Sequence, residues 1–187
     1  MIIGVIGTNG AGKDAVAKYL AEKLNWPSFS MSDELREMAK TQGLTTDRPV
    51  LQKLGNGLRA KHGGDYISNL VLQKRSNDFI VSSIRNPQEI EPFKATGHFV
   101  LLMVNADKRV RYERSKTRMR SSEDNMTFEE FVAIEEGEYD GGVNDLRLKP
   151  VFALADVIIE NDGTYEELAW KLDKFIEEVQ HGQTKLG

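Results

Sequence analysis

The glycine-rich stretch Gly7-Thr8-Asn9-Gly10-Ala11-Gly12-Lys13-Asp14 constrains the fold of this chain more than any other segment. The residues before it, Met1–Ile6, are apolar and rich in β-branched side chains, which predicts a buried strand. After it, Val16, Leu20 and Leu24 recur every four residues, the period of one helix face. The chain therefore begins with a strand, a glycine-rich turn and a helix.

This order is typical of a phosphate-binding loop, whose spacing G-x-x-x-x-G-K the stretch matches. Its glycines let successive backbone N–H groups converge on one anion, and the following helix N-terminus adds a partial positive charge. Lys13 adds a full charge that reaches the β- and γ-phosphates. We predict a nucleoside triphosphate site; the alternative is a tight turn in which Gly-Lys occurs by chance. The predicted nucleotide-binding residues of the loop are Thr8, Asn9, Gly10, Ala11, Gly12, Lys13, Asp14 and Ala15.

The composition excludes several classes of protein. A formal net charge of -4 argues against a dedicated nucleic-acid binder. The absence of cysteine excludes disulfides, thiolate metal sites and a cysteine nucleophile. No apolar run approaches membrane-spanning length, and the apolar opening lacks the basic flank of a signal peptide. We expect a cytoplasmic protein with no membrane partner, and the sequence leaves its oligomeric state open.

Apolar runs and helical periodicities alternate along the rest of the chain. Further strands are expected at residues 26–31, 78–84, 99–104 and 156–160. Three helices are expected between the second and third strands, more than a crossover needs, with Ser32 as the first N-cap. This alternation predicts an α/β fold, a three-layer α/β/α sandwich with a central parallel sheet of about five strands. We predict one domain over residues 1–187, made of a core (1–31, 78–118 and 150–180), a helical insert (32–77) and a lid region (119–149).

A basic helix expected after Asp107 supplies cations, which phosphoryl transfer requires around the phosphates. Arg111, Arg114 and Arg118 fall at i, i+3 and i+7 on one face of it. Arg118 leads into a polar segment with the composition of a lid, whose closure would carry arginines onto a phosphate. We predict Arg114 and Arg118 as catalytic residues, with Arg114 also binding the nucleotide; the alternative is a solvated basic face. An acidic helix follows, which we interpret as a solvated face: it carries Glu129, Glu130, Glu135 and Glu136.

Other charged residues fall near the predicted phosphate site. Arg85 ends a buried strand, where a charge is costly without an anionic partner, so we predict a catalytic and acceptor-binding role. Asp33 and Arg36 follow the second strand on the ligand side, and both are predicted to bind the acceptor. Asp33 is predicted as general base for an acceptor hydroxyl, or as a helix-dipole acid. Arg59 in the insert would clamp an acceptor phosphate bidentately, or form a surface ion pair.

Together these residues resemble the P-loop kinases of the adenylate kinase and dephospho-CoA kinase group, and most of all an uncharacterised family of adenylate-kinase-related proteins. The similarity runs from residue 1 to about 178. Besides the loop, the motifs that carry it are Met31-Ser32-Asp33-x-x-Arg36, Leu58-Arg59, Ile84-Arg85 followed by Glu89, Arg111-x-x-Arg114 with Arg118 and Arg120, and Ala155-Asp156-Val157-Ile158-Ile159-x-Asn161-x-Gly163. The resemblance implies a P-loop NTPase sandwich in which the insert holds the acceptor. It also implies that Asn161 and Gly163 border the adenine, although the two residues could simply form a turn.

The chain departs from such kinases at two positions that concern the metal. Asp14 stands where Ser or Thr normally contacts magnesium, and Ser82-Ser83 stands where relatives place an acid before the arginine matching Arg85. We predict that the carboxylate has in effect moved, so that Asp14 contacts Mg²⁺ directly or through water, supported by Ser82 or Ser83. The competing interpretation is that Asp14 is a helix acid stabilised by the dipole.

Three functional hypotheses follow. The first is an ATP- and Mg²⁺-dependent phosphotransferase acting on a small nucleotide-like acceptor, with Lys13 among its catalytic residues. The second changes the acceptor to a hydroxyl, as in dephospho-CoA kinase. The third is a nucleotide-binding switch with weak ATPase activity.

Overall fold

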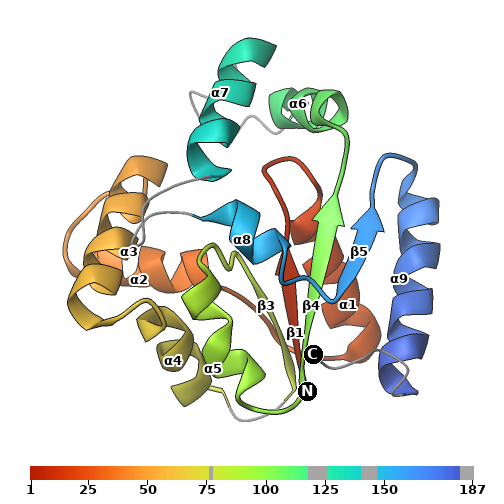
Figure 1. Cartoon of the computed structure of the whole chain (residues 1–187), viewed down its shortest axis with the longest axis horizontal. Coiled ribbons are helices and arrows are strands. Elements are labelled where there is room, and N and C mark those ends of the chain that lie inside the picture. The colour runs from red at the N-terminus through yellow and green to blue at the C-terminus, as the bar shows by residue number, and fades with distance from the viewer. Residues whose placement is uncertain (76–77, 118–125, 140–146, 182–187) are drawn as a thin grey trace.

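The computed structural model describes residues 1–75, 78–117, 126–139 and 147–181 (Figure 1). One sheet of five strands lies at its centre, in the order β2-β3-β1-β4-β5, and each of its pairings is parallel. The strands are β1 (Ile2–Ile6), β2 (Ser28–Ser30), β3 (Phe79–Ser82), β4 (Phe99–Asn105) and β5 (Val157–Glu160). The predicted five-stranded parallel sheet is confirmed.

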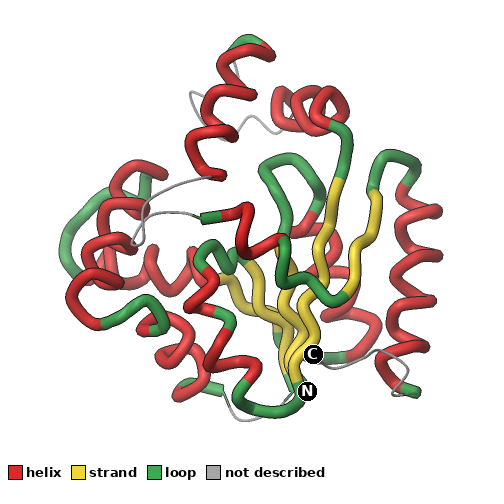
Figure 2. Tube along the Cα trace, in the orientation of Figure 1, coloured by secondary structure: helices red, strands yellow, loops and turns green. Residues whose placement is uncertain are grey.

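Helices cover the sheet from both sides (Figure 2). In the described ranges they are α1 (Lys13–Leu24), α2 (Met31–Thr41), α3 (Arg48–His62), α4 (Tyr66–Gln73), the 3-10 helix η1 (Pro87–Glu89), α5 (Glu91–Lys94), α6 (Lys108–Thr117), α7 (Phe128–Tyr139), α8 (Leu148–Phe152) and α9 (Tyr165–Gln180). None of these helices is both long enough and apolar enough to cross a membrane.

Strand β1 divides the interior into two cores, because alternate side chains of a strand point to opposite faces. Ile2 and Ile6 enter a first core together with residues of α2, α4, α5 and α8. Ile3 and Val5 enter a second core beneath α1 and α9. The same alternation continues along β4, which is buried on both faces as its unbroken apolar sequence predicted. The result is the predicted three-layer α/β/α sandwich.

The first helix of the insert begins two residues earlier than expected. The ladder between β2 and β3 ends with Ser30 opposite Ser82, and α2 begins at the next residue, Met31. The N-cap position is therefore Ser30, and the prediction of Ser32 as N-cap is wrong. Strand β3 is also shorter than predicted, because Ser83 has a φ of 66° and leaves the extended conformation.

The helices predicted between β2 and β3 are present as α2, α3 and α4. They lie together on one side of the sheet, while α6 and α7 lie beyond the carboxyl ends of the strands (Figure 1). Asn86 and Thr164 each begin a capping box, the first with Glu89 and the second with Glu167.

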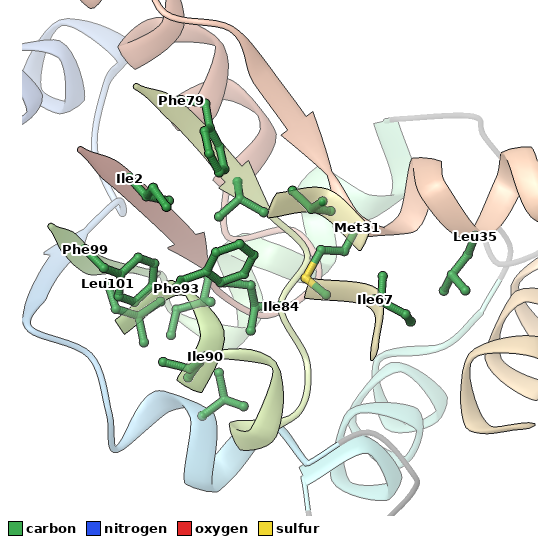
Figure 3. Packing of buried hydrophobic residues seen from close by; sticks show 14 of the residues in the cluster. Ile2, Met31, Leu35, Ile67, Phe79, Ile84, Ile90, Phe93, Phe99 and Leu101 are labelled. Carbon is green, nitrogen blue, oxygen red and sulfur yellow. The ribbon is translucent and has the colours of Figure 1, made fainter. Parts of the chain in front are cut away.

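The aromatic centre of the first core provides a test of the packing. Phe93 is fully buried, stacks on Phe99 at 5.7 Å between ring centroids, and meets Phe79 edge-on at 6.4 Å (Figure 3). Phe93→Ala should lower the free energy of unfolding by about 3–5 kcal/mol in chemical denaturation, because the cavity it leaves is lined by rigid rings. Trp170→Ala is the control: Trp170 is 63% exposed, so its loss should cost about 0.5 kcal/mol or less. Equal losses in the two variants would contradict this account of the core.

Candidate functional site

A cavity of about 540 Å³ opens at the carboxyl ends of β1, β2 and β3, a size typical of small-molecule sites. In parallel α/β sheets ligands gather at this edge. Residues from the phosphate loop, the strand ends and the insert line it together. They are Asn9, Lys13, Asp14, Ser30, Met31, Ser32, Asp33, Leu35, Arg36, Thr46, Arg48, Leu51, Gln52, Arg59, Ile67, Ser83, Arg85, Glu89, Ser115 and Met126.

The phosphate loop is held by very close packing at two glycines. Gly10 has a φ of 79°, and a Cβ on it would lie 2.5 Å from the carbonyl oxygen of Arg111. Gly12, the residue before α1, has a φ of 97°, and a Cβ there would lie 2.4 Å from Nδ2 of Asn161. Both positions need glycine for conformation and for space. The loop therefore has the strand, glycine-rich turn and helix that its sequence predicted.

Asn161, which directly follows the edge strand β5, supports the loop from the side. The buried side-chain amide of Asn161 donates to the carbonyl oxygen of Ala11 at 2.8 Å. The backbone carbonyl oxygen of Asn161 accepts from Nη1 of Arg114 at 2.8 Å. The structure thus places Asn161 and Arg114 against each other and beside the predicted nucleotide site. Gly163 lies where a Cβ would come within 1.7 Å of a carboxylate oxygen of Glu167, so the capping box of α9 requires a residue without a side chain there.

Arg111 is a second connection between α6 and the loop. Its guanidinium is almost fully buried and donates to the carbonyl oxygens of Ala106, at 2.8 Å, and Asn9, at 3.4 Å. It also forms a bidentate ion pair with Glu135 of α7, in which the Nη2–Oε2 distance is 3.0 Å. The interpretation of the acidic helix as a solvated face is therefore wrong for Glu135. A buried arginine on α6 needs a carboxylate, while Glu129, Glu130 and Glu136 are exposed.

The remaining loop residues differ in their surroundings. Lys13 and Asp14 line the cavity at the start of α1, while Ala15 in the same turn is exposed. The hydroxyl of Thr8 is buried and has no hydrogen-bond partner among the described residues. An orphaned hydroxyl in a phosphate loop fits a site whose ligand contributes the missing partner.

Asp33 and Arg36 form an ion pair on α2 at the mouth of the cavity. Nη1 of Arg36 lies 2.5 Å from Oδ1 of Asp33, and the two side chains are 46% and 66% exposed. Exposed pairs of this kind contribute little to stability, since water screens them. A ligand could therefore separate the two charges at small cost. The structure brings both residues to the cavity that Lys13 lines.

Arg59 also reaches the cavity, but its charge is matched inside the protein. Its Nε and Nη2 donate to one carboxylate oxygen of Glu89, at 2.9 and 2.8 Å. Both side chains are almost fully buried, at 4% and 1% exposure. Arg59 was predicted as an acceptor clamp with a surface ion pair as the alternative; the pair exists and is buried. The role of Arg59 toward an acceptor stays a prediction.

The two serines that end β3 have different environments. The hydroxyl of Ser82 is 3.4 Å from the carbonyl oxygen of Phe29, and Ser82 is not among the residues that line the cavity. Ser83 does line the cavity and accepts a hydrogen bond from the hydroxyl of Ser30 at 3.0 Å. Of the two serines predicted to support a metal, Ser83 reaches the cavity that Asp14 lines and Ser82 does not, because the chain turns between them; the metal role itself stays a prediction. Arg85, two residues further, lines the same cavity.

Several residues of the site were missed by the sequence analysis, or lie outside the described residues. Arg118 and Arg120, with the predicted lid contacts, lie outside the described residues. Thr46, Arg48 and Gln52 line the cavity from the insert without having been predicted, since nothing in their spacing marks them.

Comparison with known proteins agrees with this geometry. A family model described as an AAA domain matches residues 6–129. A UPF0200 protein from Sulfurisphaera tokodaii is 32% identical over 180 residues, which cover 95% of this chain and 97% of that protein. The chain therefore belongs to the AAA domain family and to the UPF0200 proteins.

Solved kinases share the fold. The shikimate kinase from Aquifex aeolicus vf5 has a TM-score of 0.54 at 19% identity, covering 97% of this chain and 99% of that one. A gluconokinase from Sinorhizobium meliloti 1021 has a TM-score of 0.55 at 14% identity, covering 96% and 95%. At these identities the likeness shows a P-loop kinase-like fold, which confirms the resemblance inferred from the motifs.

The packing of the loop can be tested with two glycines. Gly12→Ala should lower the free energy of unfolding by about 1–3 kcal/mol, because alanine is strained at this φ and would collide with Asn161. Gly57→Ala is the control: Gly57 lies inside α3 with open space around it, so alanine should stabilise the chain by about 0.5–1 kcal/mol. Urea unfolding measures both. A Gly12→Ala protein as stable as the wild type would contradict the loop geometry.

Proposed function

We propose that this chain is an ATP- and Mg²⁺-dependent phosphotransferase that transfers the γ-phosphate to a small nucleotide-like acceptor. The observation that carries the proposal is one cavity lined both by Lys13 of the phosphate loop and by Asp33 and Arg36 of the insert. A donor site and an acceptor site that share a cavity satisfy the main requirement of phosphoryl transfer, which is positioning.

Each cation has a proposed role in neutralising phosphate charge. Lys13 and the loop amides bind the β- and γ-phosphates. Arg85 stabilises the transferring group from the end of β3. Arg118 would add to it on closure of the lid region, together with Arg114, which in this structure donates to Asn161.

The oxygen ligands around the cavity fit a magnesium ion. Asp14 offers a carboxylate, and Ser83 and Ser30 offer hydroxyl oxygens in the same cavity. The described residues contain no cluster of three or more acidic, histidine or cysteine side chains that could hold a metal. This suits Mg²⁺, which uses one or two carboxylates, several waters and substrate phosphates. When bound, the ion would neutralise charge on the phosphates, with Asp14 as its protein ligand, directly or through water.

A hydroxyl acceptor is the second candidate, and the position of Asp33 favours it. A hydroxyl loses a proton during transfer, and Asp33 offers an exposed carboxylate at the cavity. The solved proteins that share this fold include a shikimate kinase and a gluconokinase, so we keep this alternative for the chain.

A phosphoryl-transfer screen separates these possibilities. The chain is incubated with ATP, Mg²⁺ and, in turn, each nucleoside monophosphate, deoxynucleotide, dephospho-CoA, shikimate and gluconate. A phosphorylated monophosphate supports the first candidate, and a product phosphorylated on a hydroxyl supports the second. Tight ATP binding with no product from any acceptor would instead favour a nucleotide-binding switch.

Lys13→Ala tests the site assignment in the same assay. The variant should fold normally and lose about 10²–10³-fold in turnover, as expected when one preorganised donor is removed from a developing charge. Lys18→Ala is the matched control, because Lys18 lies on the same helix with its side chain 77% exposed. Wild-type turnover in Lys13→Ala would overturn the assignment.

Asp14→Asn separates the metal role from the helix role. If Asp14 holds the ion, the variant should need a higher magnesium concentration for half-maximal activity, while its thermal midpoint barely changes. Asparagine keeps the size of the side chain and removes the charge that Mg²⁺ prefers. A lower midpoint with unchanged magnesium dependence would show that Asp14 serves the helix dipole.

A further inference from the structure

We propose that Glu89 is a positioning residue that ties the insert to Arg85, so that the acceptor side of the cavity and the transfer site move as one unit. This inference rests on the proposed function. It concerns a carboxylate to which the sequence analysis assigned no role of its own.

One oxygen of Glu89 faces the insert. It accepts from Nε and Nη2 of Arg59 at 2.9 and 2.8 Å, while Nη1 of Arg59 donates to the side chain of Asn56 at 3.2 Å. The guanidinium lies over Gly55, where a Cβ would be 3.2 Å from Nη1. The ion pair thus fixes α3 against the segment that follows β3.

The other oxygen of Glu89 faces the transfer site. It accepts from the backbone N–H groups of Arg85, at 2.8 Å, and Asn86, at 3.2 Å. The capping box needs only the bond from Asn86, so the bond from Arg85 is an additional contact. A single carboxylate therefore holds the insert with one oxygen and the backbone of Arg85 with the other.

Further contacts join the same two parts of the chain. The hydroxyl of Ser68 on α4 donates to the carbonyl oxygen of Glu89 at 2.6 Å. A Cβ on Gly64, in the turn before α4, would overlap the side chain of Gln88. On its other side, the carbonyl oxygen of Arg85 accepts from the backbone N–H of Arg147, just before α8, at 2.9 Å. The peptide of Arg85 is thus fixed at both of its polar groups.

Because it is buried, the ion pair between Arg59 and Glu89 is not explained by stability alone. Replacing a buried ion pair by apolar residues is often neutral or stabilising, whereas removing one partner leaves an expensive buried charge. The pair allows only one arrangement of α3 and the segment after β3, because both oxygens of the carboxylate are used. An acceptor that shifts α3 will therefore shift the backbone of Arg85 with it.

The test uses the full chain with the double change Arg59→Met and Glu89→Gln. Methionine and glutamine keep the volume and remove both charges, so no buried charge is left alone. Glutamine can still accept the backbone hydrogen bonds of the capping box. The matched control is Glu91→Gln, two residues away and exposed. Two quantities are measured: backbone amide exchange of residues 84–90, and steady-state kinetics with the acceptor found in the screen.

We expect faster amide exchange over residues 84–90, a fall in kcat of about tenfold to a hundredfold, and an unchanged KM for ATP, because the transferring group is misplaced and the phosphate loop is not. Unchanged exchange overturns the inference, and so does faster exchange with an unchanged kcat. If the wild-type chain transfers phosphate to no acceptor, the proposed function fails, and the exchange measurement still decides whether the ion pair holds Arg85.

Discussion

The close approach of backbone and side chains around the phosphate loop is the constraint on which the site depends. At Gly10 the main chain of α6 comes so near that no side chain fits, and at Gly12 the amide of Asn161 does the same. The loop is thus shaped from outside as much as by its own sequence. Its curvature, and the direction of its N–H groups, come from packing against residues that lie between 102 and 150 positions later in the chain.

The two arginine pairs beside the cavity illustrate how burial decides what a charge can do. The pair of Arg36 and Asp33 is in contact with water, so it contributes little to stability and can be exchanged for contacts with a ligand. The pair of Arg59 and Glu89 is shielded, so neither charge can leave without a large cost. The same chemistry therefore gives one adaptable group and one fixed group within a single cavity.

Local signals in the sequence predicted much of this molecule. The sheet, its parallel strands and the phosphate loop follow from apolar runs, glycine spacing and helix periodicity, which act over a few residues. Pairings across long separations were not predictable in this way. Nothing near Arg59 points to Glu89, and nothing near Arg111 points to Glu135, although a buried arginine requires an acid somewhere. Which of Ser82 and Ser83 lines the cavity depended on where β3 ends. A shift of one residue moves a side chain to the other face of the sheet.

The contact between Asn161 and Ala11 has a consequence for synthesis of the chain on the ribosome. The loop emerges before the residue that braces it, which is 150 positions further along the chain. The central strand β1 must likewise wait for its neighbours β3 and β4. A nascent chain that carries the phosphate-binding sequence but not yet Asn161 therefore lacks the brace that the loop has in the folded protein.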